Sequence, residues 1–358
     1  MKSILNALLV AVLSLAMILL PARTPAQAPE PQTGGQPQQD HTAPKQTEKP
    51  TQQGGATIAL EVPVVTLDVI ATTQHGDLLT GLKKENFRVL DNGVPQTITS
   101  FGATDAPITI VMLMEFSSLG YEWFAYQAKY WADAFFPNLK KDDWVALVTF
   151  DMNPRLEVDF TQNKDEVRDA VYHLYFPGFR ESNVFDALLD TVERLKEVKG
   201  KKSILVLASG MDTFSKHTLD QTIKALRQSD VTIFSVGVAK PFSNWLEMRG
   251  ALGTNMNLLQ GENQLRTFAQ LTGGYSWFPQ FDGEIPGIFH DLTAYLRNQY
   301  SLSFTPTQAN DGKFHKVKVE LVAPDGSPLA VTDRKGKKQK VVVYAREGYT
   351  ATSGGVGD

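Results

Sequence analysis

The pattern of hydrophobic and polar residues changes twice along the chain. Over residues 58–71 hydrophobic and polar residues alternate, which is the period of a half-buried β-strand. A short Lys/Glu-rich helical turn and two further strand-like runs, at 87–90 and 96–101, follow. Between residues 105 and 297, continuous hydrophobic runs alternate with stretches in which hydrophobic residues recur every three or four positions, as in amphipathic helices. From residue 299 onward the strand pattern returns. These changes predict two β-rich segments on either side of an α/β region.

The central region alternates strands and helices. Buried strands are expected over residues 108–114, 144–150, 203–208, 231–238 and 274–278, with a hairpin partner of the second strand over 156–160. Helices are expected over residues 121–136, 164–175, 184–198, 219–228, 263–271 and 285–297. Since βαβ connections place helices on both faces of a parallel sheet, the predicted fold class is α/β, with a Rossmann-like, doubly wound, mostly parallel sheet.

The two β-rich segments, residues 57–104 and 298–350, are each too short to enclose a hydrophobic core. Their strands are expected over residues 58–71, 87–90, 96–101, 300–304, 314–322 and 340–345. Tight turns are expected at Asp91-Asn92-Gly93, Asp311-Gly312 and Asp325-Gly326. The simplest arrangement is a small split β-sandwich formed by both segments, with the α/β domain, residues 105–297, inserted through a loop.

The N-terminus has the pattern of an export signal. Lys2 precedes an almost uncharged hydrophobic run over residues 4–20, and Ala26-Gln27-Ala28 has the small–x–small form of a signal-peptidase site. Residues 1–28 are therefore predicted to be a signal peptide, with an uncleaved membrane anchor as the alternative. Pro- and Gln-rich residues 29–56 are predicted to be a disordered linker, and residues 351–358 a disordered tail. The mature chain is expected in the periplasm or outside the cell, and not to span a membrane.

Composition excludes several classes of function. The 35 Lys and Arg residues against 39 Asp and Glu give a formal net charge of −4, without the basic excess that binds nucleic acid. The chain has no cysteine, which rules out disulfides, Cys-ligated zinc, iron–sulfur clusters and thiol nucleophiles. Neither a G-x-G-x-x-G motif nor a Walker A motif is present, which disfavours a nucleotide site.

Three polar loops lie where an open α/β sheet binds its ligands. Ligands bind beyond the carboxyl ends of parallel strands. The loops at that edge are residues 115–120 after the first buried strand, residues 180–188, and residues 209–213 after the strand over 203–208.

These loops resemble those of the von Willebrand factor type A (VWFA) domain. That domain carries D-x-S-x-S after its first strand, a threonine before a helix, and an aspartate in a T-D-G turn. Further motifs resemble, in their order, the acidobacterial-type VWFA-related family of secreted bacterial proteins. They lie at residues 81–93 (G-L-x-x-x-N-F-x-V-x-D-N-G), 300–306, 311–319 and 345–349. The resemblance extends over nearly all of residues 57–350.

The resemblance implies a metal-ion-dependent adhesion site, in which hydroxyls and carboxylates hold Mg²⁺ beside an acidic partner. The ligand positions of the family fall on Glu115, Ser117, Leu119, Ser182 and Ser209. Leu119 offers no oxygen and Ser209 offers no carboxylate, so the adhesion site is degenerate. Acidic residues that could compensate are Asp151, Glu181 and Asp212.

Three interpretations of this face stay open. The expectation is that no cofactor is bound; a divalent cation, if the degenerate site still holds one, would be ligated by Glu115, Ser117 and Ser182. If no cation is bound, the face is either a relic whose loops pack through hydrogen bonds or a metal-free binding face. The candidate ligand-binding face consists of Glu115, Ser117, Ser182, Ser209 and Asp212.

Three other segments suggest alternatives. In the helix over 121–136 the core positions are Phe124, Ala128, Trp131 and Phe135, while Trp123, Tyr126 and Tyr130 either pack under a loop or form an exposed aromatic patch. Residues 240–262 are either an irregular packing element or a partner-recognition loop. Residues 334–340 carry five positive charges, which indicates a solvated hairpin loop or a site for an anionic polymer.

The sequence therefore predicts an exported, non-enzymatic VWFA-like interaction or adhesion module for a protein or cell-envelope ligand. One alternative is a periplasmic structural scaffold with a vestigial VWFA face. A less favoured alternative is a serine hydrolase that uses Ser117 or Ser209, with His217 the nearest candidate base to Ser209. Neither serine lies in a G-x-S-x-G elbow.

Overall fold

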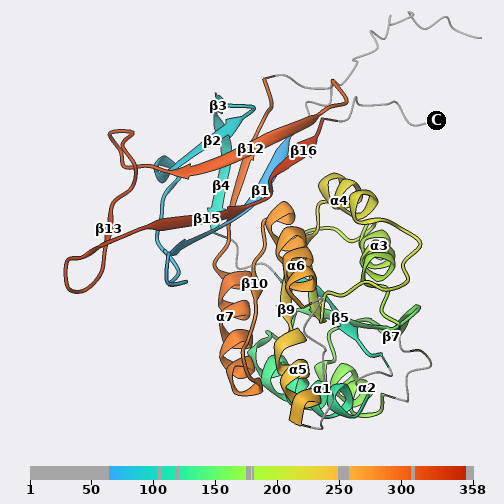
Figure 1. Cartoon of the computed structure of the whole chain (residues 1–358). Helices are drawn as coiled ribbons and strands as arrows, with labels where there is room; N and C mark the ends of the chain where they lie inside the picture. Colours follow the sequence, from blue (N-terminus) through green and yellow to red (C-terminus); the bar gives the residue numbers. More distant parts are fainter. Residues whose placement is uncertain are drawn as a thin grey trace, which may run out of the picture. The chain divides into compact units, whose positions relative to one another are not determined.

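The computed structural model in Figure 1 describes residues 64–103, 107–117, 121–174, 179, 181–248, 258–307 and 311–351. The predicted signal peptide and linker, the start of the first predicted strand, and the tail after residue 351 lie outside these residues. All described residues belong to one compact unit. Across these ranges, the search for a helix with the length and hydrophobicity to cross a bilayer finds none.

A six-stranded sheet in the order β10-β9-β8-β5-β6-β7 forms the centre of the α/β domain. Its strands are β5 (Thr109–Glu115), β6 (Trp144–Phe150), β7 (Pro154–Thr161), β8 (Lys202–Ala208), β9 (Thr232–Gly237) and β10 (Ser276–Trp277). Neighbouring strands are parallel except β6 and β7, which form the antiparallel hairpin predicted. Every residue of β8 and β9 is buried, because helices cover both faces of the sheet.

Helices lie on the two faces of this sheet (Figure 1). The α-helices of the described residues are α1 (Tyr121–Phe135), α2 (Lys164–Tyr172), α3 (Val184–Arg194), α4 (Leu219–Gln228), α5 (Ala239–Met248), α6 (Leu258–Thr272) and α7 (Ile285–Arg297). Short 3₁₀ helices are η1 (Lys84–Asn86), η3 (Phe136–Asn138) and η5 (Asp282–Glu284). Two separate hydrophobic clusters flank the sheet, one containing Trp131 and Phe289, the other containing Leu188 and Phe268. The predicted doubly wound α/β class is confirmed.

Two antiparallel sheets with a shared hydrophobic cluster form the β-sandwich, in the orders β15-β1-β11-β4 and β16-β12-β2-β3. Their strands are β1 (Val65–Thr73), β2 (Phe87–Asp91), β3 (Val94–Gln96), β4 (Ile98–Ala103), β11 (Tyr300–Phe304), β12 (Phe314–Leu321), β15 (Val341–Ala345) and β16 (Gly348–Thr350). Strands β13 (Val331–Thr332) and β14 (Lys338–Gln339) form a separate hairpin around the basic run, as predicted. Strand β11 pairs with both β1 and β4, so the split sandwich is confirmed.

The α/β domain is inserted between two paired strands of the sandwich. Ala103 at the end of β4 lies opposite Tyr300 at the start of β11. The insertion therefore leaves and returns to the sandwich at neighbouring positions of one sheet.

A buried polar network in the second sheet brings several of the family-like motifs together. His315 is 2% exposed, and its Nδ1 and Nε2 lie 3.0 Å from Asp91 Oδ1 and 3.1 Å from Asp311 Oδ1. The Tyr349 hydroxyl donates to Asp91 Oδ2 at 2.8 Å. Burial alone would lower the pKa of His315, but its hydrogen bonds to Asp91 and Asp311 and their charges outweigh this effect and raise that pKa. The network therefore holds β2, β12 and β16 together through charge.

The expected irregular segment over residues 240–262 is wrong for its described part. Helix α5 occupies Ala239–Met248, and α6 begins at Leu258, five residues before the predicted start; residues 249–257 lie outside the description. Pro241 and Gly261 obscured the helical pattern. Proline is tolerated in the first turn of a helix, where its missing N–H has no partner to lose.

Helix α5 also explains the position of Trp123. This side chain is 2% exposed and packs against Phe242 of α5, with ring centroids 5.4 Å apart. Tyr126, one turn away, is 74% exposed. Of the residues off the core stripe of α1, Trp123 therefore packs against a helix, whereas Tyr126 and Tyr130, which is 39% exposed, lie one turn apart on the surface.

Candidate functional site

The candidate site lies at the edge of the central sheet where β5 and β8 end. Glu115 is the last residue of β5, and Ser209 directly follows β8, its neighbour in the sheet. Ser182 lies two residues before α3 and also interacts with Glu115. The structure thus brings together these three predicted site residues, because the carboxyl ends of parallel strands share one edge.

Glu115 makes its closest polar contacts with Ser209. The carboxyl group is buried, and its Oε2 accepts hydrogen bonds from the Ser209 amide at 2.8 Å and the Ser209 hydroxyl at 2.7 Å. Burial raises the pKa of Glu115 above its ordinary value, although the bonds from Ser209 and the nearby Ser182 hydroxyl partly oppose this rise. A carboxylate oxygen that a cation would need is therefore already used by the chain itself.

Ser182 is held by Thr213 in the loop after β8. The Ser182 amide donates to Thr213 Oγ1 at 2.9 Å, and the Thr213 amide donates to the Ser182 carbonyl at 2.8 Å. The Ser182 hydroxyl is buried and has no hydrogen-bond partner of standard geometry among the described residues. Sequence reasoning missed Thr213; its position in a loop at a strand end, beside Asp212, was the available signal.

The Asp212 carboxylate is occupied by local structure. Its Oδ1 accepts from the Ser215 hydroxyl at 2.5 Å and from the Phe185 amide, in the first turn of α3, at 3.3 Å. This arrangement satisfies a helix N-terminus, which a carboxylate stabilises. Ser117 is 3% exposed, and Leu119 lies outside the described residues.

Asp151, expected to compensate for a missing ligand, is bound to basic and backbone groups. Its Oδ1 accepts from Arg155 at 2.8 Å and from the Asn153 amide at 3.1 Å. Its Oδ2 and the Asn183 side-chain oxygen are buried without a hydrogen-bond partner in the described structure. The residues around the loops therefore contain unsatisfied oxygens, but Asp151 already has a cationic partner.

The donor set fits Mg²⁺ poorly. The described ranges contain no group of three or more His, Asp or Glu side chains placed to hold a metal ion. The Oε2 atom of Glu115 already accepts two hydrogen bonds, and Ser209 has a hydroxyl group where the family has a second carboxylate. Because Mg²⁺ requires oxygen ligands in near-octahedral geometry, the contacts of these residues do not match its needs.

The contacts do not pair Ser209 with His217, as the hydrolase alternative would require of that serine. The Ser209 side chain is 1% exposed and its hydroxyl donates to Glu115, not to a histidine. His217 Nδ1 instead lies 2.8 Å from Asp186 Oδ1 on a half-exposed surface. A serine nucleophile needs a base within hydrogen-bond reach, and the observed partner of Ser209 is a carboxyl group.

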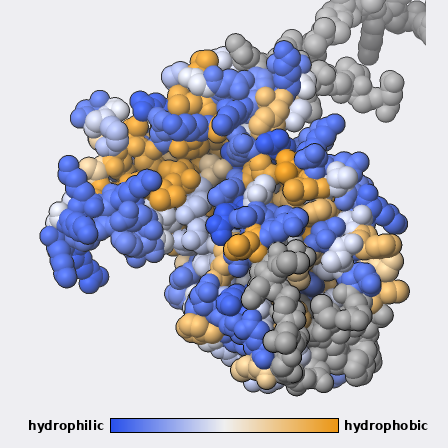
Figure 2. Space-filling view, in the orientation of Figure 1, coloured by the Kyte–Doolittle hydropathy of each residue, from blue (hydrophilic) through white to orange (hydrophobic). Residues whose placement is uncertain are grey.

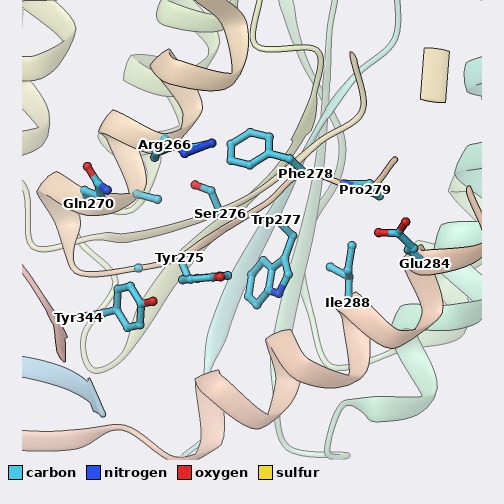
Figure 3. A pocket seen from close by; sticks show the side chains of 12 residues that line it. Arg266, Gln270, Tyr275, Ser276, Trp277, Phe278, Pro279, Glu284, Ile288 and Tyr344 are labelled. Carbon is cyan, nitrogen blue, oxygen red and sulfur yellow. The ribbon is translucent and has the colours of Figure 1, made fainter. Parts of the chain in front are cut away.

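A separate pocket of about 500 Å³ lies beside β10, an edge strand of the central sheet (Figure 3). Tyr275 forms its aromatic wall, with ring centroids 4.7 Å from Trp277 and 5.0 Å from Tyr344. Burial raises the pKa of Tyr344 to about 12. The Arg266 guanidinium lies 4.6 Å from the ring centre of Phe278. The described residues that line this pocket do not include those at the Glu115 edge.

Comparison with known proteins gives a family for the central domain. Residues 110–271 match the model of the von Willebrand factor type A domain. No curated protein matches the chain.

Solved structures similar to this chain include three bacterial proteins. A von Willebrand factor type A protein from Catenulispora acidiphila is 12% identical, with a TM-score of 0.41, over 73% of this chain and 72% of that one. An aerotolerance-related membrane protein from Bacteroides fragilis is 11% identical, with a TM-score of 0.39, over 52% and 98%. The vWF domain of the type V pili tip protein Mfa5 from Porphyromonas gingivalis is 12% identical, with a TM-score of 0.36, over 54% and 96%. The family match therefore assigns residues 110–271, less than half of this chain, to the von Willebrand factor type A domain.

Proposed function

We propose that this chain is an exported, non-enzymatic interaction module that binds a protein or cell-envelope ligand at the Glu115 edge of its VWFA domain, without a metal ion. The observation that carries the proposal is the pairing of Glu115 with Ser209. The carboxyl group accepts two hydrogen bonds from Ser209, at 2.7 and 2.8 Å, where the family site would present it to a cation. A ligand would then be recognised by the surface around the loops rather than through a bridging metal.

Exposed hydrophobic side chains adjoin this edge. Phe214, in the loop after β8, is 58% exposed, and Leu259, in the first turn of α6, is 73% exposed. The first turn of α6 packs so closely on the end of β8 that a Cβ atom on Gly261 would lie 2.5 Å from the Ser209 carbonyl oxygen. Large hydrophobic side chains beside buried polar loops suit the anchoring contacts of a protein interface.

The scaffold alternative draws support from a different observation. Several polar groups of these loops bond to one another, as in the pairing of Ser182 with Thr213 and of Asp212 with Ser215. In that alternative the loops would complete the packing of the domain and bind no ligand. Contacts with other molecules would be made by the sandwich.

Photo-crosslinking in living cells separates these two functions. We expect a crosslinking amino acid at position 214 of the full chain to capture a discrete partner, and one at position 94, on strand β3, to capture none. Leu259→Asp should weaken the crosslink from position 214, whereas Val94→Asp, a matched change of another exposed side chain, should not. No specific product from position 214, or equal products from both positions, would favour the scaffold.

Cation dependence tests the metal-free part of the proposal. After treatment with EDTA, the melting temperature of the full chain should not change with millimolar Mg²⁺, Mn²⁺ or Ca²⁺. A ligand that binds only the folded state raises the melting temperature by mass action. A rise that disappears in Glu115→Gln would overturn a metal-free site.

A further inference from the structure

The sandwich has a hydrophobic groove on the side away from strands β3 and β4. Its volume is about 830 Å³, and it runs between β12 of one sheet and β15 of the other. Figure 2 shows this hydrophobic surface between the two strands labelled in Figure 1. The hydrophobic side chains that line it include Val317, Val319, Leu321, Val341, Val343 and Ala345.

Both strands beside the groove have an uncovered edge. Among the described strands, β15 is the last of its sheet and pairs with β1 alone. Strand β16 pairs with β12 over Phe314–Lys316, and the Val317 amide donates to the Glu347 carbonyl. At the other end of β12 the Leu329 amide donates to the Leu321 carbonyl, so among the described residues the edge of β12 is uncovered over residues 318–320. An uncovered edge presents backbone N–H and C=O groups in the spacing that another strand requires.

The exposure of β15 shows that the sandwich is open along the groove. Every residue of β15 is partly exposed, including Val341 and Val343, which pack against the sandwich core. Leu67 and Val69 of the neighbouring strand β1 are fully buried by comparison. Inward-facing residues of a closed sandwich are buried, so the sandwich is open to solvent along β15.

A concentration of positive charge lies at one end of the groove. The loop of the β13–β14 hairpin and its flanks carry exposed Arg334, Lys335, Lys337, Lys338 and Lys340. Lys340 directly precedes β15 and lines the groove. In a second copy of this chain, β15 is flanked by Lys340 and Arg346, so it would not supply the opposite charge. Charge complementarity therefore favours an acidic partner over self-association.

We propose that this groove binds an extended segment of another protein, added as a strand at the edge of β15, with hydrophobic residues at alternate positions and acidic residues at the end near the hairpin. Alternate side chains of a strand point to the same face, so one set would fill the groove while its backbone pairs with β15. This site is distinct from the Glu115 edge, and its occupation does not depend on the function proposed there.

A synthetic peptide tests the proposal. The probe is a fluorescein-labelled peptide of sequence EEVTVTVEE, which places acidic residues at both ends and hydrophobic residues at every second position between them. We expect it to bind the full chain, and Val343→Asp to weaken binding at least tenfold. Val94→Asp, at the opposite edge of the sandwich, should leave binding unchanged. The combined variant Lys335→Glu, Lys337→Glu and Lys338→Glu lies in the exposed hairpin and should also weaken binding at least tenfold without disturbing the core.

Several outcomes would overturn the proposal. Equal binding of the peptide to the folded Val343→Asp variant would place the peptide elsewhere. Equal binding of a nonamer of glutamate would assign the interaction to charge alone, and equal binding of a peptide N-methylated at its valine amides would exclude strand pairing. Failure of the probe to slow amide hydrogen exchange at residues 341–343 would do the same. Dimerisation of the free chain that Val343→Asp abolishes, measured by sedimentation, would assign the groove to a second copy instead.

Discussion

Replacement of Glu115 by alanine should destabilise the folded chain, not only alter a binding face. The change leaves the amide and the hydroxyl of Ser209 without their acceptor in a buried site. A buried donor that loses its partner costs about 1–3 kcal/mol, so two of them should lower the free energy of unfolding by about 2–6 kcal/mol. Loss of binding in Glu115→Ala would therefore not by itself distinguish a binding residue from a structural one.

Two partner variants separate the contributions. Ser209→Ala removes the hydroxyl donor and keeps the amide, so it should cost less, about 1.5–3 kcal/mol for a hydrogen bond to a charged group. Glu115→Gln keeps an acceptor oxygen and should be the mildest of the three. The two alanine changes combined should cost less than their sum, because each removes the same contact between side chains.

The pH dependence has a definite sign. Burial raises the pKa of Glu115 in the folded state above its unfolded value. A carboxyl group shifted in this direction contributes its full stabilisation below the unfolded pKa and loses it as pH rises through the folded pKa. The deficit of Glu115→Gln relative to wild type should therefore be larger at acidic pH and shrink as pH rises.

Urea unfolding followed by tryptophan fluorescence measures these effects. The wild type, both single alanine variants and the double variant form a double-mutant cycle. The slope of the unfolding free energy against urea concentration should be the same for all four proteins, which shows that unfolding exposes the same surface in each. A coupling energy below about 0.5 kcal/mol would refute the reasoning, since residues in direct contact couple more strongly than this. It would also remove the main support for a metal-free site.

Three further outcomes are expected. His315→Ala should lower the free energy of unfolding by about 3–5 kcal/mol because it removes the charged partner of the buried Asp91 and leaves that carboxylate only the Tyr349 hydroxyl among the described side chains. Because the folded-state pKa of His315 is raised, the wild-type melting temperature should fall as pH rises from the unfolded histidine pKa through the folded one, and the variant should show a smaller fall; an unchanged pH profile would contradict this. Gly210→Ala should be more destabilising in urea than Gly312→Ala, since both have positive φ but a Cβ at Gly210 would lie 2.4 Å from a backbone oxygen while that at Gly312 meets open space; equal midpoints would argue against the close approach of α6. Trp131→Ala should lower the free energy of unfolding by about 3–5 kcal/mol because the side chain is fully buried, and calorimetry can test this. A loss below about 1 kcal/mol would contradict the burial of Trp131 and the position of its helix.

The local sequence pattern was sufficient to predict the bounds of helices whose hydrophobic periodicity and ends are both clear. Helix α4 occupies Leu219–Gln228 and α7 occupies Ile285–Arg297, as their periodicity predicts. At α4 the Thr218 side chain accepts from the Gln221 amide, a capping box that marks the start of a helix in sequence. Helix α6 carries a similar signal, Asn257 followed by Gln260 three residues later, but Gly261 weakened the hydrophobic pattern after it.

Contacts between distant residues were beyond the reach of the pattern. The strand ends predicted that Glu115, Ser182 and Ser209 share an edge, but nothing local showed that Glu115 bonds to Ser209. The burial of Trp123 likewise depends on α5, more than a hundred residues later in the chain. Side chains on one element are placed by a partner element whose position only the folded chain determines.

The insertion of the VWFA domain between β4 and β11 has a mechanical consequence. Since Ala103 and Tyr300 lie opposite each other in one sheet, the domain is a side branch of the sandwich. Tension applied between the start of β1 and the end of β16 would reach the covalent connections of the inserted domain only after β4 and β11 separate. Before that, the tension would reach the domain only through contacts such as the ion pair of Arg227 in α4 with Glu347, which lies between β15 and β16. The sandwich would then act as the force-bearing part of the chain, and the contacts of Glu347 with α4 and α6 would set how much tension reaches the inserted domain.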